Sequence, residues 1–154
     1  MREYIHYGSK EFDIIQFNKV KNIPLWTKPS GGLWASYIDS EYSWKQWCQD
    51  NCFRECDEKN SFKFRIDSNS NIFHIYSVKD LEKLPRVTLS NPALSYDKYL
   101  IDFEKSAKEY DAIELHLSEE TDIPEGTLCG LYYALYAWDC DSILIMNPKC
   151  VIPI

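Results

Sequence analysis

The chain has 154 residues, of which 45% are hydrophobic and 15% aromatic, and its formal net charge is −7 at pH 7. This length and composition fit one globular domain, residues 1–154, with a sizeable buried core, and they exclude a disordered chain. The negative charge excludes strong general affinity for nucleic acid, because such binding needs Lys and Arg to displace counterions from phosphates.

The sequence carries no signal for export or for a membrane span. No apolar run reaches the length of about 18 residues that a membrane helix needs. The N-terminal residues Met-Arg-Glu-Tyr-Ile-His lack the apolar stretch of a secretory signal. We therefore expect a cytoplasmic protein without a membrane partner, whose six cysteines are free thiols.

The first half of the chain alternates strands, a loop and one helix. Apolar and polar residues alternate from Ser61 to Asp67, as in a half-buried strand, and a second strand follows a short turn, so the two predict a hairpin. Ser40 is the expected N-cap of the helix. The predicted elements are strands Glu3–Tyr7, Leu33–Ser36, Ser61–Asp67 and Ile72–Tyr76, a loop from Asn22 to Pro29, and a helix from Glu41 to about Glu55.

The second half of the chain is richer in predicted helix. Leu100, Phe103, Ala107 and Tyr110 recur at the spacing of one helical face. A continuous apolar run after Asp141 predicts a central strand. The predicted elements are helices Val78–Leu84, Asp97–Tyr110 and Thr127–Trp138, and strands Ala112–Leu117 and Ser142–Met146.

These elements show no regular alternation of strand, helix and strand. The sequence therefore favours the α+β class over a doubly wound parallel sheet. We expect small mixed or antiparallel sheets that form a split, β-sandwich-like core flanked by helices.

The cysteines and two of the histidines have ordinary structural interpretations. Cys48, Cys52 and Cys56 recur every four residues and extend an apolar stripe of the predicted helix, so packing is favoured and no metal site is predicted. His74 and His116 each lie between apolar residues on a predicted strand. Alternation places both on the polar face, where we expect them to face solvent.

Three other segments combine residues that are hard to explain as generic core or loop. The first is His6-Tyr7-Gly8-Ser9, an imidazole followed by a bend and a hydroxyl. The second runs from Lys28 to Ser36 and reads KPSGGLWAS, with two glycines before an aromatic residue. The third, residues 138–145, reads WDCDSILI and places Asp141 directly before the predicted central strand.

In this order the three segments resemble the catalytic domain of the ADP-ribosyltransferases, especially the branch of the poly-ADP-ribose polymerases and diphtheria-type toxins. The first segment resembles the family's His-Gly-Ser/Thr motif, with Tyr7 inserted. The second resembles its aromatic strand, with Trp34 at the position of a tyrosine, followed by Ser43 and Trp44 or Trp47. The third resembles its acidic strand, with Asp141 in place of Glu.

The resemblance implies that NAD lies in a cleft between two small sheets and donates ADP-ribose to a protein, nucleic acid or small-molecule acceptor. Under this resemblance, His6 donates to a ribose, Gly8 pairs with the nicotinamide amide, and Asp141 orients the ribose and stabilises the positive charge of the breaking glycosidic bond. Trp34 with Trp44 or Trp47 would sandwich the nicotinamide ring. The remaining implied contacts to NAD are Ser9, Gly32, Ser36 and Ser43.

Two other functions fit the same residues. One is a catalytically silent cleft that holds a nucleotide or a peptide. The other is a protein-interaction domain whose Trp-rich segment is the interface, since Trp is a preferred interface anchor.

Overall fold

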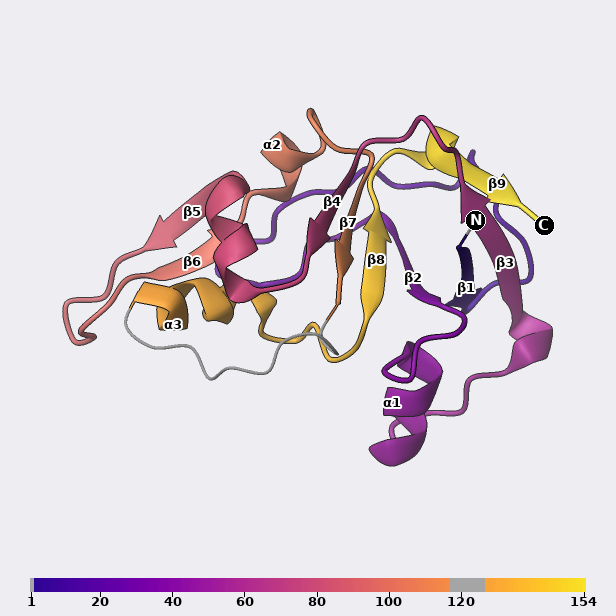
Figure 1. Ribbon diagram of the computed structural model, residues 1–154, viewed down its shortest axis with the longest axis horizontal. Coiled ribbons are helices and arrows are strands. Elements are labelled where there is room, and N and C mark those ends of the chain that lie inside the picture. The colour runs from indigo at the N-terminus through magenta and orange to yellow at the C-terminus, as the bar shows by residue number, and fades with distance from the viewer. Residues whose placement is uncertain (1, 117–126) are drawn as a thin grey trace.

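The computed structural model describes residues 2–116 and 127–154, and these form an α+β protein, as predicted (Figure 1). In this part of the chain, seven strands make one mixed sheet in the order β4-β7-β8-β2-β1-β3-β9, and β5 and β6 pair separately. The strands are β1 (Glu3–Tyr7), β2 (Leu33–Tyr37), β3 (Ser61–Ile66), β4 (Ile72–Ile75), β5 (Arg86–Leu89), β6 (Lys98–Ile101), β7 (Ala112–Leu115), β8 (Ser142–Ile145) and β9 (Val151–Pro153).

The helices are short and lie at two ends of the sheet. Helix α1 (Trp44–Asp50) lies near the ends of β1 and β2, whereas α3 (Thr127–Tyr132) packs at the other end beside β6 (Figure 1). Among the described residues, none of the helices has the length and apolar content to span a bilayer. The other helices are α2 (Phe103–Ser106) and the 3₁₀ helices Glu58–Asn60, Val78–Lys83, Tyr133–Leu135 and Pro148–Cys150.

The centre of the sheet is buried on both faces. Ile143, Leu144 and Ile145 of β8 are fully buried, which confirms the central strand predicted from the apolar run. Leu144 belongs to one apolar cluster, with Ile113 of β7, and its two neighbours belong to a second cluster on the opposite face. Helices cover the Leu144 face, and residues of β1 and β3 contribute to the other cluster.

Among the described strands, β2 joins the two halves of the sheet, with β8 on one side and β1 on the other. The first half of β2 pairs with β8, from Leu33 opposite Ile145 to Ala35 opposite Ile143. Its second half pairs with β1 at two positions, Tyr37 opposite Tyr4 and Ser36 opposite Ile5. Strand β1 continues to Tyr7 along β3 but has left β2 by then. This divergence leaves room beside Trp34 and Ser36.

The predicted hairpin of Ser61–Asp67 with Ile72–Tyr76 is wrong. Strand β3 lies between β1 and β9, and β4 lies at the far edge of the sheet, where it runs parallel to β7. The aromatic ring of Phe64 on β3 stacks on Tyr4 of β1, 5.6 Å between centroids. Packing between residues distant in sequence therefore decides the pairing, against the local turn.

The predicted helix Asp97–Tyr110 is also wrong, because its apolar residues belong to two elements. Leu100 lies in strand β6, and Phe103 begins α2. Asp102 caps this short helix by accepting a hydrogen bond from the backbone N–H of Lys105, 3.1 Å away. A strand followed by one helical turn thus produced the spacing of a helical face.

Two other predicted helices are present but shorter. Helix α1 begins after Ser43, which accepts from the Gln46 N–H, and not after Ser40. The predicted buried helix Thr127–Trp138 is divided into α3 and the 3₁₀ helix Tyr133–Leu135, with Trp138 buried beyond it.

Gly31 and Gly32 lead into β2, and the crowding around Gly32 predicts how a substitution there changes the stability of the fold. Gly32 has φ +71°, and a Cβ there would lie 2.5 Å from Leu144 Cδ1 and 3.0 Å from the Ile145 carbonyl oxygen. We expect Gly32→Ala to lower the free energy of unfolding by about 2–4 kcal/mol, because it adds left-handed backbone strain to a crowded contact. Thermal denaturation followed by circular dichroism measures the effect, a loss of roughly 5–15 °C in melting temperature.

The matched control is Ser30→Ala, whose side chain is exposed two residues earlier. We expect it to change stability by less than about 0.5 kcal/mol. Equal melting temperatures for the two variants would contradict this account of the strand entry.

Candidate functional site

A cavity of about 270 Å³ lies where β1 leaves β2. We name it the Trp34 cavity. Strand alternation places one set of residues from each strand on this face of the sheet. Its walls include Ile5 and Tyr7 from β1, Trp34 and Ser36 from β2, Trp44 from α1, and Ser142 from β8.

Two tryptophans form aromatic walls of the Trp34 cavity, and a cationic side chain lies over the ring of each. The Lys28 ammonium lies 5.1 Å from the ring centroid of Trp34, and the Arg54 guanidinium carbon lies 5.5 Å from that of Trp44. Lys28 and Arg54 also line the cavity. The cavity therefore combines flat π surfaces with two positive charges, although the chain as a whole is acidic.

Other rings hold the two walls in place. Trp34 packs edge-on against the buried Trp138, with 4.8 Å between centroids. Trp44 stacks on Trp47 at 5.2 Å and an interplanar angle of 12°. Trp47 therefore supports Trp44 from one side, and Trp44 is the residue of this pair that lines the cavity.

Ser36 joins the three elements around the cavity. Its hydroxyl donates to the Asp141 carbonyl oxygen at 3.1 Å and accepts from the Trp44 N–H at 2.9 Å. The residue is 99% buried, with a relative exposure of 1%. These bonds tie β2 to the start of β8 and to the first turn of α1, so they fix the spacing of the cavity walls.

His6 lies on the opposite face of β1 from the cavity. Its ring packs on Phe62, 5.2 Å between centroids, and its Nδ1 donates to the Trp34 carbonyl oxygen at 2.7 Å. Burial lowers the pKa of this imidazole, and the bond to Trp34 works in the other direction. His6 thus contacts the backbone behind Trp34 and is absent from the residues that line the cavity.

Asp141 also points away from the Trp34 cavity. Its carboxylate accepts from the Ser40 hydroxyl at 2.8 Å, and the residue lines a second cavity of about 360 Å³, which we name the Asp141 cavity. Asp139, two residues earlier, is exposed and lines the Trp34 cavity. The carboxylates of Asp139 and Asp141, just before β8, therefore line different cavities.

Gly8, Ser9, Gly32 and Ser43, the remaining residues implied by the family resemblance, are absent from the residues that line the Trp34 cavity. Gly8 ends β1, and its N–H donates to the Asn60 carbonyl at 2.9 Å, while Ser9 follows in the loop. Gly32 provides the tight entry to β2, and Ser43 caps α1. The structure thus brings Trp34, Ser36 and Trp44 together at the cavity.

The cysteines supply no reactive group at the Trp34 cavity. All six are free. Cys140 lines the cavity, but burial raises the pKa of its thiol to about 12, so it is neutral at pH 7. Cys48 of α1 is buried, as the apolar stripe predicts, whereas Cys52 lies past the end of the helix and is exposed.

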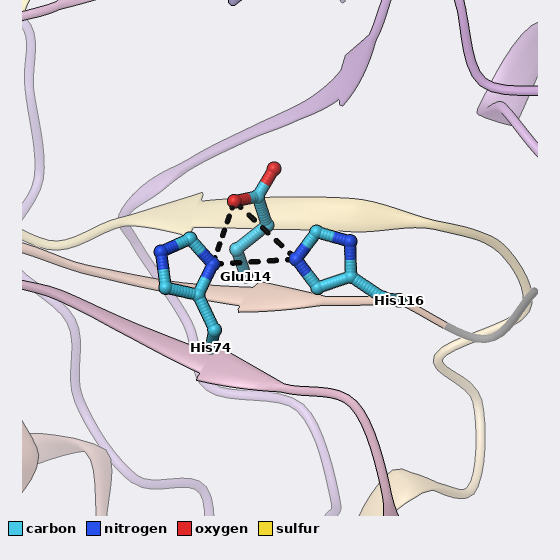
Figure 2. A group of neighbouring side chains, drawn as sticks. All are labelled: His74, Glu114 and His116. Atoms are coloured by element: carbon cyan, nitrogen blue, oxygen red, sulfur yellow. Dashed lines mark hydrogen bonds and ion pairs between the residues drawn. The ribbon is translucent and has the colours of Figure 1, made fainter. Parts of the chain in front are cut away.

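A second polar cluster lies on the other face of the sheet and was missed from the sequence. His74 of β4, Glu114 of β7 and His116 directly after β7 converge (Figure 2). The prediction of a solvent-facing histidine is wrong for His116, which is only 8% exposed, whereas His74 is partly exposed, and both rings contact Glu114. The Glu-x-His spacing at 114 and 116 was the available signal, because it places both side chains on one face of a strand.

Glu114 is ionised in this cluster. Burial alone would raise the pKa of its carboxyl, but interactions with His116, His74 and the Tyr4 hydroxyl outweigh that effect and hold it at about 2. The Tyr4 hydroxyl donates to Oε1 at 2.9 Å, and the Arg2 guanidinium lies 3.6 Å from the same oxygen. The carboxylate is therefore held in one orientation by partners on β1 and near its start.

Comparison of the chain with protein-family models, curated proteins and solved structures finds no match. The function must therefore be argued from the geometry of the two sites.

Proposed function

We propose that this protein binds NAD in the Trp34 cavity and transfers ADP-ribose from it to a nucleophilic acceptor. The observation that carries the proposal is the pairing of aromatic walls with cations at the place where β1 and β2 diverge. The three segments that resemble ADP-ribosyltransferase motifs lie on the adjacent strands β1, β2 and β8. The acceptor is a protein, a nucleic acid or a small molecule in the cytoplasm.

The aromatic walls suit the nicotinamide end of NAD. The oxidised nicotinamide ring is flat and positively charged, and the faces of Trp34 and Trp44 already attract cations, Lys28 and Arg54. The cavity volume of about 270 Å³ lies just below the range of about 300–1,000 Å³ that is usual for ligand pockets. The cavity therefore accepts the nicotinamide riboside, and the rest of NAD extends past the cavity mouth.

The two cations suit the diphosphate of NAD. Lys28 is partly exposed and Arg54 is exposed, and the two side chains lie over different tryptophans of the cavity. When the nicotinamide ring takes the place of these cations over the tryptophans, the charged groups can turn toward the mouth and pair with the phosphate oxygens. Lys28 and Arg54 thus exchange their contacts with the tryptophan rings for contacts with the diphosphate.

A carboxylate is needed beside the ribose, because breaking the bond to nicotinamide leaves positive charge on the sugar. Asp139 lines the Trp34 cavity, and the Asp141 carboxylate lies in the other cavity. We therefore assign charge stabilisation to Asp139. Asp141 acts through its backbone, whose carbonyl and N–H bind Ser36 and Tyr42 and fix the start of β8.

The first experiment measures NAD binding and nicotinamide release by the purified chain. We expect NAD to quench tryptophan fluorescence and nicotinamide to appear slowly, by transfer to water when no acceptor is present. Trp34→Ala removes one aromatic wall and should weaken NAD binding at least about tenfold.

The matched control is Trp26→Ala, because Trp26 is 68% exposed and does not line the cavity. It should bind NAD like the wild type. Binding without release would favour the catalytically silent cleft, and the absence of both would reject the NAD proposal.

A second experiment separates the two aspartates. We expect Asp139→Asn to lower nicotinamide release by about 10²–10³-fold, the usual cost of losing an electrostatic stabiliser, with NAD binding retained. Asp141→Asn keeps an acceptor for Ser40 and should release nicotinamide near the wild-type rate. The reverse pattern in the initial rates would assign catalysis to Asp141.

A further inference from the structure

We propose that His74, Glu114 and His116 form a binding site for one Zn²⁺ ion with an open fourth position. This inference is independent of the NAD proposal, because the cluster lies on the opposite face of the sheet from the Trp34 cavity. Three ligand atoms point at one another there: His74 Nδ1, His116 Nε2 and Glu114 Oε2 (Figure 2).

The strand register explains why these three atoms meet. Strands β4 and β7 run parallel, with His74 directly opposite Glu114. His116 is two residues beyond Glu114 and so projects from the same face. The ligands therefore come from two neighbouring strands, and rigid elements of this kind hold metal ligands more accurately than loops do.

The distances between the three atoms match tetrahedral coordination. Glu114 Oε2 lies 3.0 Å from His74 Nδ1 and 3.5 Å from His116 Nε2, and the two nitrogens are 3.3 Å apart. Four-coordinate Zn²⁺ with bonds of about 2.0–2.1 Å sets its ligand atoms about 3.3–3.4 Å apart. Octahedral ions with similar bonds require about 3.0 Å, so the average spacing favours Zn²⁺.

The polar network of this cluster leaves one buried oxygen of Glu114 without a hydrogen-bond donor among the described residues. Glu114 Oε2 is buried, and within the described residues no hydrogen bond reaches it, although its side chain is only 4% exposed. His74 Nδ1 and His116 Nε2 approach this oxygen as ion-pair partners and hydrogen-bond to each other at 3.3 Å. A buried carboxylate oxygen without a donor is costly, and a cation at the meeting point of the three atoms removes that cost.

The surroundings of the carboxylate also fit a metal ligand. Oε1 is held by the Tyr4 hydroxyl and lies near Arg2, which leaves Oε2 directed at the imidazoles. The Tyr76 ring stacks on His116, with 4.4 Å between centroids, and restrains the ring plane. Partners of this kind orient metal ligands and commonly contribute 10–100-fold to metal affinity.

The fourth coordination position would be accessible from the Asp141 cavity. That cavity, of about 360 Å³, is lined by His116, Glu114 and Arg2 as well as Asp141. Two histidines and a glutamate with one open position are typical of catalytic zinc, which binds a water of lowered pKa. The half-exposed Arg2 supplies a positive charge, so the ligand class that fits this position is a small anion.

The test is a zinc titration of the full chain after removal of metal with a chelator, followed by isothermal calorimetry. We expect one Zn²⁺ per chain with submicromolar affinity, and a rise in melting temperature of about 5–10 °C at a hundredfold excess over Kd. Glu114→Gln, which keeps size and removes charge, and His74→Ala should each weaken binding at least about 100-fold. Glu82→Gln, which changes an exposed carboxylate outside the cluster, should bind Zn²⁺ like the wild type.

A cobalt titration of the wild type separates this site from the cysteines. Four-coordinate Co²⁺ on nitrogen and oxygen ligands should give visible d–d absorption without the near-ultraviolet charge transfer of thiolates. Three results would overturn the proposal. They are a wild type that binds no Zn²⁺ below about 10 µM, a cobalt spectrum with thiolate charge transfer, and full zinc affinity in Glu114→Gln. The wild-type titrations test the site directly, so they decide the question even where a variant fails to fold.

Discussion

The hydrogen bond from His6 Nδ1 to the Trp34 carbonyl marks the constraint on which the Trp34 cavity depends. At this point the β1–β2 ladder has ended after Ile5 and Ser36, so the Trp34 carbonyl has no backbone partner on β1. A carbonyl that is partly withdrawn from solvent is stabilised by a donor, and the imidazole provides it. The two strands can therefore separate by the width of a side chain without leaving a polar group unsatisfied, and the cavity forms in that separation.

The start of β8 contributes residues to cavities on both faces of the sheet. At the start of β8, Ser142 faces the Trp34 cavity, and Asp141 faces the cavity that adjoins Glu114 and His116. Ser36 binds the backbone between them, so a change there would disturb both sites. The two proposed functions nevertheless use different side chains, since the Trp34 site relies on aromatic walls and cations and the histidine cluster on metal ligands. Each can therefore fail in an experiment without the other.

The sequence predicted the elements whose burial pattern is local. The apolar run of β8 and the glycine-led entry to β2 are visible without partners, and the α+β class followed from the lack of regular strand, helix and strand alternation. The sequence did not predict which distant strands pair. That pairing places β4 beside β7, abolishes the predicted hairpin and brings His74 to Glu114. The fold also brings Trp34 and Trp44 to one cavity. His6 and Asp141 point to the other face of the sheet, because their neighbours Ile5, Tyr7 and Ser142 line the cavity.

The central claim is that the divergence of β1 from β2 creates a binding site for NAD between Trp34 and Trp44. The five tryptophans give five indole N–H signals in a proton–nitrogen correlation spectrum, which can be assigned by single substitutions. Titration with NAD tests the claim most directly. The account predicts that the signals of Trp34 and Trp44 shift with one saturation curve while that of the exposed Trp26 stays in place. Shifts at Trp26 alone, or no shift at saturating NAD, would contradict it.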